Sequence, residues 1–344
     1  MDVKLKKFLK KVILFLFPPV VILVTLYGVF DPFFLFNEPR KNPGNFIQNN
    51  RGHFNARLIL KNNREHNINY NSFILASSRG LVFDIEDWGK ATGQKTFSGF
   101  HFEDNRESIF GMYKKAVFLD KYGFDLKNVL VLIDHEVLEH TEEKSGMFER
   151  ISPFYNRKIY QNFLFYLDHA KVYFDPRFFI PYFASKFTTK HYEFMEEVID
   201  PNFPGLNHIN NQVNFKRTEK YLKPKLYYTN ELIKTIESKK EERLPKKAVL
   251  IGEKQKYFLG EMSNIFKKHN TLVKIVINPL ADQIPFDQKS LNYLYNLFGK
   301  ENVFNYSGRN KITSNYLNYY EDIHYRPHVA KEILDEAYSS KVRD

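Results

Sequence analysis

The sequence predicts an α/β protein in which helices cover both faces of a parallel β-sheet. Short apolar runs at Phe73–Ala76 and Asn128–Ile133 fit strands that are buried on both faces. Segments with helical spacing, such as Asp104–Tyr122, separate such runs, and this alternation is typical of a three-layer, flavodoxin-like arrangement. A long apolar segment near the N-terminus adds a transmembrane helix to the prediction.

The composition is that of a globular protein rich in aromatic residues. The chain has 344 residues and a formal net charge of +11, and 17% of its residues are aromatic. It contains no cysteine, which excludes disulfides, thiolate metal sites and cysteine nucleophiles. Basic residues are mixed with acidic ones, as in Glu142-Glu143-Lys144, and form no basic aromatic face. We therefore expect no nucleic-acid partner.

The N-terminal segment predicts a single-pass anchor in the cell membrane. Residues 1–11 hold five lysines and form a predicted cytoplasmic tail, and residues 12–31 form the anchor. Val12–Phe30 carries no charge and is close to the ~20 residues that cross a bilayer as a helix. A cleaved signal peptide and a buried core helix are the alternatives, but no small-x-small cleavage site follows and no polar face interrupts the run. The lysines place the N-terminus in the cytoplasm and the main domain outside it, in the periplasm or the extracellular space.

The rest of the chain divides into four predicted parts. Residues 32–70 lead into the sheet, 71–137 form the first part of the α/β domain, 138–245 form a helical insertion or cap, and 246–344 form its second part. In this last part we expect strands at 248–252, 272–279 and 302–306, and helices at 257–269, 288–298 and 327–338. The segment Gly93–Phe100 fits a loop, a short strand and a glycine turn.

Two distant motifs carry the residue types of a nucleophilic triad. Ser77 and Ser78 follow the first predicted strand, at the carboxyl end where parallel sheets present functional groups. His324 precedes the last predicted helix and has Glu321 three residues and Asp322 two residues before it. A serine nucleophile needs a base to take its proton and an acid to orient that base, and these residues supply both. The alternative role for the serines is helix capping.

Three further side chains are candidates for contact with a substrate. Arg79 directly follows the serines and could hold an anionic group, with a structural ion pair as the alternative. His101 lies just past the short strand, and His135 follows the strand Asn128–Ile133. His101 could reach the cleft, although a surface position is the default for such a residue, and His135 could line the mouth of the site.

The segment His135–His140 offers a rival metal site. Its two histidines and two glutamates come close to the zinc patterns H-E-x-x-H and H-x-x-E-H but miss each by one residue. On a helix His135 faces Glu139 and Glu136 faces His140, so neither face holds three ligands. We therefore predict no metal and no cofactor.

The serine motif and the acid-x-x-His motif together resemble the SGNH (GDSL-like) hydrolase superfamily. The resemblance is to its membrane-anchored bacterial envelope branch, related to alginate O-acetylation and teichoic-acid D-alanylation proteins. It covers residues 71–135 and 248–340 and implies a nucleophile at Ser78, with Glu321 in the usual aspartate position and Asp322 as a substitute. It also implies that the N–H groups of Ser78 and Gly99 stabilise the oxyanion.

Two positions depart from the pattern of this superfamily. Ala76 replaces the usual glycine, and Asp134-His135 stands where the block G-x-N-D is expected. The asparagine of that block completes the oxyanion hole, and loss of one such donor typically lowers a rate by about 10²–10³-fold. The envelope branch often lacks this asparagine as well.

The resemblance implies a serine esterase or O-acyltransferase with a Ser-His-Glu/Asp triad. Its substrate would be an acyl group, acetyl as the first choice, on a cell-surface polysaccharide or related glycan, and a membrane acyltransferase would be its partner. One alternative is a non-catalytic SGNH-like envelope scaffold that binds glycan or such an acyltransferase. A metal-dependent envelope protein built on His135–His140 is another.

Overall fold

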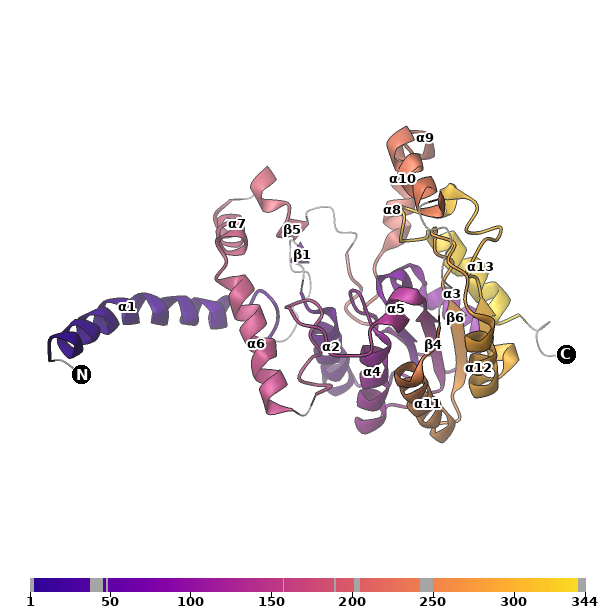
Figure 1. Ribbon diagram of the computed structural model, residues 1–344, viewed down its shortest axis with the longest axis horizontal. Coiled ribbons are helices and arrows are strands. Elements are labelled where there is room, and N and C mark those ends of the chain that lie inside the picture. The colour runs from indigo at the N-terminus through magenta and orange to yellow at the C-terminus, as the bar shows by residue number, and fades with distance from the viewer. Residues whose placement is uncertain are drawn as a thin grey trace.

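The computed structural model describes residues 3–37, 46–47, 49–156, 158–188, 190–200, 205–241 and 250–339. The centre of the described part is a five-stranded parallel sheet in the order β3-β2-β4-β6-β7 (Figure 1). Its strands are β2 (Ser72–Leu75), β3 (Gly99–His101), β4 (Asn128–Ile133), β6 (Leu272–Ile277) and β7 (Val303–Asn305). Counted along the chain this is the order 2-1-3-4-5 of flavodoxin-like sheets, so the predicted α/β class with a parallel sheet is confirmed.

Helices cover both faces of the sheet, because successive strand residues point to opposite sides. Phe73, Val129 and Ile275 belong to one hydrophobic core, and Ile74 and Leu130 belong to the other. The first core packs against α2 (Arg51–His66), α4 (Ile109–Lys121), α11 (Glu253–Lys268) and α12 (Gln288–Phe298). The second core packs against α3 (Ile85–Thr92) and α13 (Pro327–Ala337).

Helix α1 (Val3–Phe30) extends away from the rest of the protein (Figure 1). It is long and apolar enough to cross a membrane, and its side chains are almost all exposed. The helix starts within the lysine-rich segment that was predicted as a tail and runs through the proline pair Pro18-Pro19. It ends at Phe30, and the carboxylate of the next residue, Asp31, accepts hydrogen bonds from the N–H groups of Leu35, Phe36 and Asn37.

The segment 138–245 is mainly helical and has two separate parts (Figure 1). The first part contains α6 (Ile159–Tyr173), α7 (Pro176–Phe187), the 3₁₀ helix η2 (Glu193–Met195) and β5 (Ile199–Asp200), which pairs with β1 (Phe46–Ile47). It packs on the end of α1. The second part contains α8 (Phe215–Tyr221), α9 (Pro224–Tyr227) and α10 (Asn230–Glu241), and it packs near the C-terminal loops. The remaining elements are α5 (His135–Glu139) and the 3₁₀ helices η1 (Ser78–Val82), η3 (Lys300–Asn302) and η4 (Tyr316–Asn318).

One predicted strand is replaced by other structure. Residues 250–252 of the predicted strand 248–252 are not in the sheet, and 248–249 lie outside the described residues. Ile251 instead is buried beside α12, where its N–H donates to the Ser290 hydroxyl, and the chain then enters α11. Because β4 pairs directly with β6, no position remains for this run between them.

Candidate active site

Ser78 stands at the carboxyl end of β2, at the start of η1. The chain folds back sharply here, and a Cβ atom at Gly80 would come within 2.3 Å of the Ala76 Cβ, so only glycine allows this close approach. The turn is held by a hydrogen bond from the Gly80 N–H to the Ser77 carbonyl (2.8 Å). Ser77 is buried and its hydroxyl has no partner among the described residues, whereas Ser78 is partly exposed. The turn therefore presents the Ser78 hydroxyl at the sheet edge.

The structure brings Ser78, His324 and Glu321 together as a hydrogen-bonded chain. The Ser78 Oγ lies 2.8 Å from His324 Nε2. On the other side of the ring, His324 Nδ1 contacts the Glu321 carboxylate, which also accepts the His324 N–H at 3.3 Å. With the ring proton on Nδ1 facing the carboxylate, Nε2 is free to accept the hydroxyl proton. Both His324 and Glu321 are partly exposed, so the group can be reached from solvent.

The two candidate acids occupy different places. Glu321 faces the ring of His324, whereas the Asp322 carboxylate lies 3.6 Å from the Lys239 Nζ on α10. The two side chains point to different sides of the loop, so only Glu321 is placed to orient the His324 ring, a choice that the sequence left open. Asp322 links the loop to the helical segment instead.

The loop that carries His324 is closed on itself and fixed to the sheet. Tyr319 and Tyr325 form an antiparallel bridge, and the Tyr320 N–H donates to the His324 carbonyl (2.9 Å). The two bridge tyrosines are fully buried, and their hydroxyls donate to the Pro279 carbonyl (2.9 Å) and to Asn278 Oδ1 (3.0 Å), just after β6. Burial raises the pKa of Tyr325 well above its ordinary value, which keeps its hydroxyl a donor.

The second helical part holds the same loop from outside. The hydroxyls of Tyr227 and Tyr228 donate to the carbonyls of Tyr320 (2.9 Å) and Tyr319 (2.7 Å). Glu219 on α8 accepts from the Tyr320 hydroxyl (2.6 Å) and forms an ion pair with Arg326. Helices α8 to α10 therefore fix the position of the His324 loop.

Arg79 is committed to structural ion pairs rather than open to a ligand. Its buried guanidinium contacts Asp134 (3.1 Å) and Glu136 (2.7 Å) and donates to the Ile323 carbonyl (3.3 Å). Burial alone would lower the pKa of Arg79, but the two carboxylates outweigh it and raise the pKa above its ordinary value. The expected role of Arg79 in substrate binding is thus corrected: it ties the turn that carries Ser78 to the His324 loop.

Asp134 directly follows β4, where the resemblance would lead one to expect the block G-x-N-D. Its carboxylate caps α5 by accepting the Val137 N–H (3.0 Å), and it also accepts from Arg79 and from Asn278 (2.8 Å). An ionised carboxylate only accepts hydrogen bonds, so Asp134 cannot stabilise an oxyanion.

The two candidate histidines lie in different surroundings. His101 lies within β3, fully buried, with Nε2 2.7 Å from the Phe83 carbonyl, and burial lowers its pKa to about 4. It is a neutral core residue, which corrects the prediction that it lines the cleft. His135 begins α5 at the carboxyl edge of the sheet, partly exposed, with Nε2 3.5 Å from Asp282. Among the described residues no three His, Asp or Glu side chains form a metal-binding group.

Gly99 lies at the amino ends of the strands, whereas Ser78 follows the carboxyl end of β2. It starts β3 and pairs in register with Ser72, at the amino end of β2. At about 3.3 Å per residue, the strand from Ser72 to Ala76 already separates Gly99 from the Ser78 turn by roughly 13 Å. The expectation that its N–H holds the oxyanion is therefore corrected. The glycine is needed for packing, because a Cβ there would come within 2.8 Å of the Ile85 side chain.

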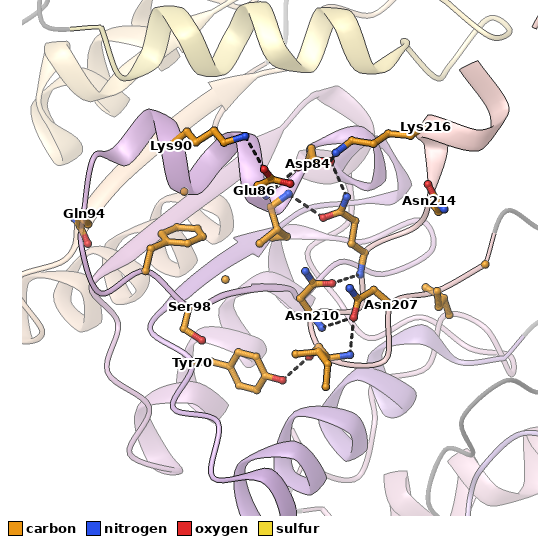
Figure 2. A pocket seen from close by; sticks show the side chains of 18 of the residues that line it. Tyr70, Asp84, Glu86, Lys90, Gln94, Ser98, Asn207, Asn210, Asn214 and Lys216 are labelled. Carbon is orange, nitrogen blue, oxygen red and sulfur yellow. Dashed lines mark hydrogen bonds and ion pairs between the residues drawn. The ribbon is translucent and has the colours of Figure 1, made fainter. Parts of the chain in front are cut away.

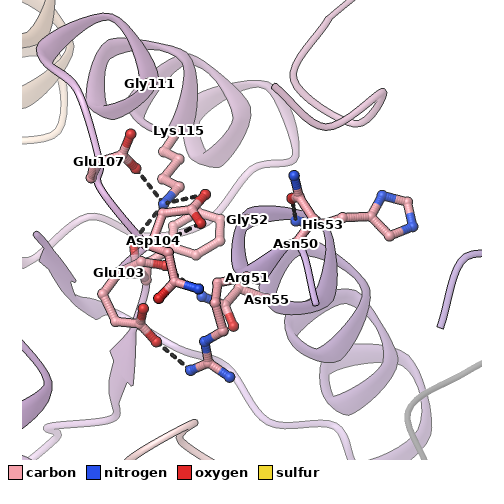
Figure 3. Close-up of polar contacts among 12 residues, drawn as sticks. Asn50, Arg51, Gly52, His53, Asn55, Glu103, Asp104, Glu107, Gly111 and Lys115 are labelled. Atoms are coloured by element: carbon pink, nitrogen blue, oxygen red, sulfur yellow. Dashed lines mark hydrogen bonds and ion pairs between the residues drawn. The ribbon is translucent and has the colours of Figure 1, made fainter. Parts of the chain in front are cut away.

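A buried charged cluster lies beside the candidate site and was not anticipated from the sequence (Figure 3). It joins Arg51 on α2 with Glu103 and joins Lys115 on α4 with Glu107 (2.5 Å) and Asp104 (3.5 Å). The Asp104 N–H donates to the Ala76 carbonyl (3.0 Å), so the cluster supports the turn that carries Ser78. Burial raises the pKa of Asp104 to about 7. The charged residues come from three separate segments, and no spacing in the sequence connects them.

A polar cavity of about 890 Å³ lies near the amino end of β3, around Gly99 (Figure 2). Tyr70, Ser98 and the N-terminal part of α3 border it, and the loop Gly205–Asn214 closes one side. Its labelled lining is rich in amide side chains, and its lysines Lys90 and Lys216 pair with the carboxylates of Glu86 (2.6 Å) and Asp84 (2.9 Å).

Comparison with known proteins adds no relative. No family model, no curated protein and no solved structure matches the chain.

Proposed function

We propose that the protein is a membrane-anchored serine esterase or O-acyltransferase of SGNH type. The observation that carries the proposal is the contact between the Ser78 Oγ and His324 Nε2 (2.8 Å), with Glu321 on the other ring nitrogen. Support also comes from its place at the carboxyl end of the central strands, where open α/β sheets hold their ligands. The buried contacts of Arg79, Asn278 and Tyr325 pre-organise the group.

The proposed reaction proceeds through an acyl-serine. The Ser78 Oγ attacks the carbonyl carbon of an ester while its proton passes to His324 Nε2. Glu321 stabilises the resulting imidazolium. The bond to the leaving alcohol then breaks, and the alcohol takes the proton from Nε2. Water or an acceptor hydroxyl repeats these steps in reverse and releases the acyl group.

The oxyanion in this proposal is held by the Ser78 N–H. Since Gly99 and Asp134 do not contribute, a second donor has to come from elsewhere, and the loop after β3 is the adjacent segment. There the Asp104 N–H is already bound to Ala76, and the Asn105 N–H donates to the Asp104 carboxylate (2.9 Å). Substrate binding would have to displace one of these contacts.

The substrate class follows from the family resemblance and from α1. The helix is suited to anchor the domain in the cell membrane, with the N-terminal lysines in the cytoplasm and the domain in the periplasm or extracellular space. There the acyl groups, acetyl first, of a cell-surface polysaccharide are the proposed substrate, with a membrane acyltransferase as partner.

The test is active-site labelling of the full-length protein with a fluorophosphonate probe, together with hydrolysis of p-nitrophenyl acetate. Ser78→Ala should abolish labelling and reduce hydrolysis by several orders of magnitude. Ser77→Ala is the matched control and should keep both activities, because the Ser77 hydroxyl is buried and unbonded among the described residues. Labelling that survives in Ser78→Ala would contradict the proposal.

The polar cavity of Figure 2 favours a second candidate function, glycan binding by a non-catalytic envelope scaffold. Its amides suit the hydroxyl groups of a polysaccharide, and acidic groups of the polysaccharide would compete with Glu86 and Asp84 for the two lysines. Retention of the protein on an immobilised acidic polysaccharide would measure this. Binding that is lost in Asn210→Ala and kept in Ser78→Ala, with no probe labelling of the wild type, would favour this function over catalysis.

A further inference from the structure

Helix α6 exposes a continuous apolar and aromatic face. Ile159, Phe163, Tyr166 and Phe174 follow at helical spacing, and Tyr160 flanks them. Ile159 is 85% exposed and Phe163 is 61% exposed, values unusual for residues that normally lie in a core. The adjoining face of the helix carries Phe165, His169 and Tyr173, which are fully buried. Both faces of α6 are therefore apolar, and only one is covered by the protein.

The exposed face of α6 is continuous with the end of α1. The Tyr166 ring stacks on Phe36, and the Phe36 ring contacts Tyr27 on α1. The Phe174 ring also contacts Tyr27 (6.1 Å between ring centroids). Figure 1 shows α6 lying crosswise at the end of α1, between α1 and the sheet. If α1 crosses a bilayer, this arrangement puts α6 along the membrane surface.

The charges around this face suit a membrane with anionic headgroups. Helices α6 and α7 are described in full, and none of their exposed residues is acidic. Lys158, Lys171 and Lys186 are exposed, and the Asp168 carboxylate on the inner side lies 2.7 Å from Arg150 and 3.8 Å from Lys171. The exposed acidic residues nearby, Glu193, Glu196 and Glu197, follow α7 and lie outside both helices. Exposed apolar rings flanked by lysines are typical of helices that lie in the membrane interface.

Helix α7 extends the same surface. Ile180 and Phe187 are exposed, and the Phe30 ring at the end of α1 contacts the Phe183 ring (5.2 Å between centroids). Aromatic residues are enriched where a membrane helix leaves the hydrocarbon layer, because their rings suit the headgroup region. The exposed side chains of α6 and α7 and the exit of α1 thus form one surface, which we call the interfacial surface.

We propose that the interfacial surface, centred on the exposed face of α6, lies in the headgroup region of the bilayer that α1 crosses. The inference rests on the membrane anchor of the proposed function. It adds a second contact, about 5–10 Å deep in the boundary between headgroups and acyl chains, which fixes the orientation of the domain. The occupant is an anionic lipid surface, not another protein.

The absence of cysteine makes a direct test possible in the full-length chain. Single-cysteine variants labelled with the environment-sensitive dye NBD are reconstituted into vesicles of phosphatidylcholine and phosphatidylglycerol that contain nitroxide lipids. Phe163→Cys reports on α6, Leu226→Cys is an exposed apolar control on α9, and Phe15→Cys reports on α1. Nitroxides high and low on the acyl chain measure the depth of each dye.

At position 163 we expect emission shifted to the blue and quenching that is stronger for the shallow nitroxide than for the deep one. Position 226 should show neither effect, and position 15 should be quenched most by the deep nitroxide. Changing Lys158 and Lys171 to glutamine should weaken the contact, since each lysine near an anionic surface contributes about fivefold in binding.

The experiment distinguishes a wrong interfacial contact from a wrong membrane anchor. A dye at 163 that stays in water while the dye at 15 is in lipid overturns the interfacial contact and leaves the anchor intact. A dye at 15 that stays in water overturns both. A dye at 163 that is shielded only in native membranes, and not in pure lipid vesicles, overturns the lipid assignment in favour of a protein partner.

Discussion

The two parts of the segment 138–245 use aromatic residues in different ways. In the first part, Phe163 and Ile180 project from α6 and α7 with nothing covering them in the described protein. In the second part, Tyr227 and Tyr228 end α9 and donate their hydroxyls to backbone carbonyls of the His324 loop. Both parts show aromatic residues at helical spacing, so sequence pattern alone does not separate them.

The difference lies in the polar end of the ring. A tyrosine that bonds a carbonyl fixes a loop at a defined distance, whereas an exposed phenylalanine gives only apolar area, which is useful against lipid or another apolar surface. We infer that the second part is coupled to the candidate site and that the first part is not. The following predictions test that contrast.

The largest effect is expected from Glu321→Gln, within the loop that the second part holds. Without the carboxylate, the His324 imidazole loses the group that fixes its tautomer, and the rate of probe labelling should fall by about 10⁴-fold. Asp322→Asn is the matched control and should label at nearly the wild-type rate, because Asp322 faces Lys239. Equal losses in both variants would contradict the assignment of the acid.

The first part should carry a dependence of stability on pH through His169. Burial lowers the pKa of His169 to about 4 from an ordinary 6.5. The folded protein thus binds fewer protons than the unfolded chain, so its stability is fully present above pH 6.5 and is lost as the pH falls through about 4. The loss from this group is up to about 3 kcal/mol.

Urea unfolding of the detergent-solubilised chain at several pH values measures this loss. His169→Gln should flatten the dependence between pH 6.5 and 4. Burial also lowers the pKa of the neighbouring His53, to about 3, so part of the dependence should remain in the variant. An unchanged curve in His169→Gln would show that His169 does not govern it.

Removing one charge from each part of the segment 138–245 should show which part supports the candidate site. Glu219→Gln breaks the ion pair with Arg326 in the second part, and Asp168→Asn breaks the pair with Arg150 in the first. Each should lower the free energy of unfolding by about 1–3 kcal/mol. Only Glu219→Gln should also slow probe labelling of the folded protein, because only Glu219 supports the His324 loop. Slowed labelling in both would remove the distinction.

The smallest effects are expected from single aromatic changes. Tyr228→Phe loses the hydrogen bonds from its hydroxyl to the carbonyls of Leu317 (3.1 Å) and Tyr319. It should lower the free energy of unfolding by about 1 kcal/mol. Phe163→Ser should change it by less than about 0.5 kcal/mol in detergent, because the ring is exposed. Comparison of the two urea midpoints checks this difference, and a larger loss in Phe163→Ser would show that its ring packs on protein.

The sheet could be predicted from the sequence because its strands are buried on both faces. The runs predicted at 73–76, 128–133 and 272–279 correspond to β2, β4 and β6. The run 248–252 has the same composition, but its described residues 250–252 lie outside the sheet, where only Ile251 is buried, beside α12. An apolar composition suggests that a run is buried, but the run forms a strand only if a neighbouring strand is free to pair with it.

The candidate site was predictable where it rests on local spacing. The three-residue step from Glu321 to His324 is the contact observed, and the strand end places Ser78 beside it. Gly99 was misplaced because glycine at a strand start and glycine in a turn look alike in sequence. The roles of Arg79 and His101 depend on partners far away in the chain, such as Asp134 and Phe83, which no local pattern reveals.

The contact between Ser78 and His324 joins residues that are 246 positions apart. A ribosome delivers the chain from its N-terminus, so the serine emerges long before the histidine. The strands β3, β4, β6 and β7 lie between them in the sequence, and contacts of such large sequence separation are slow to form. The contact between Ser78 and His324 can therefore form only after nearly the whole domain has been synthesised.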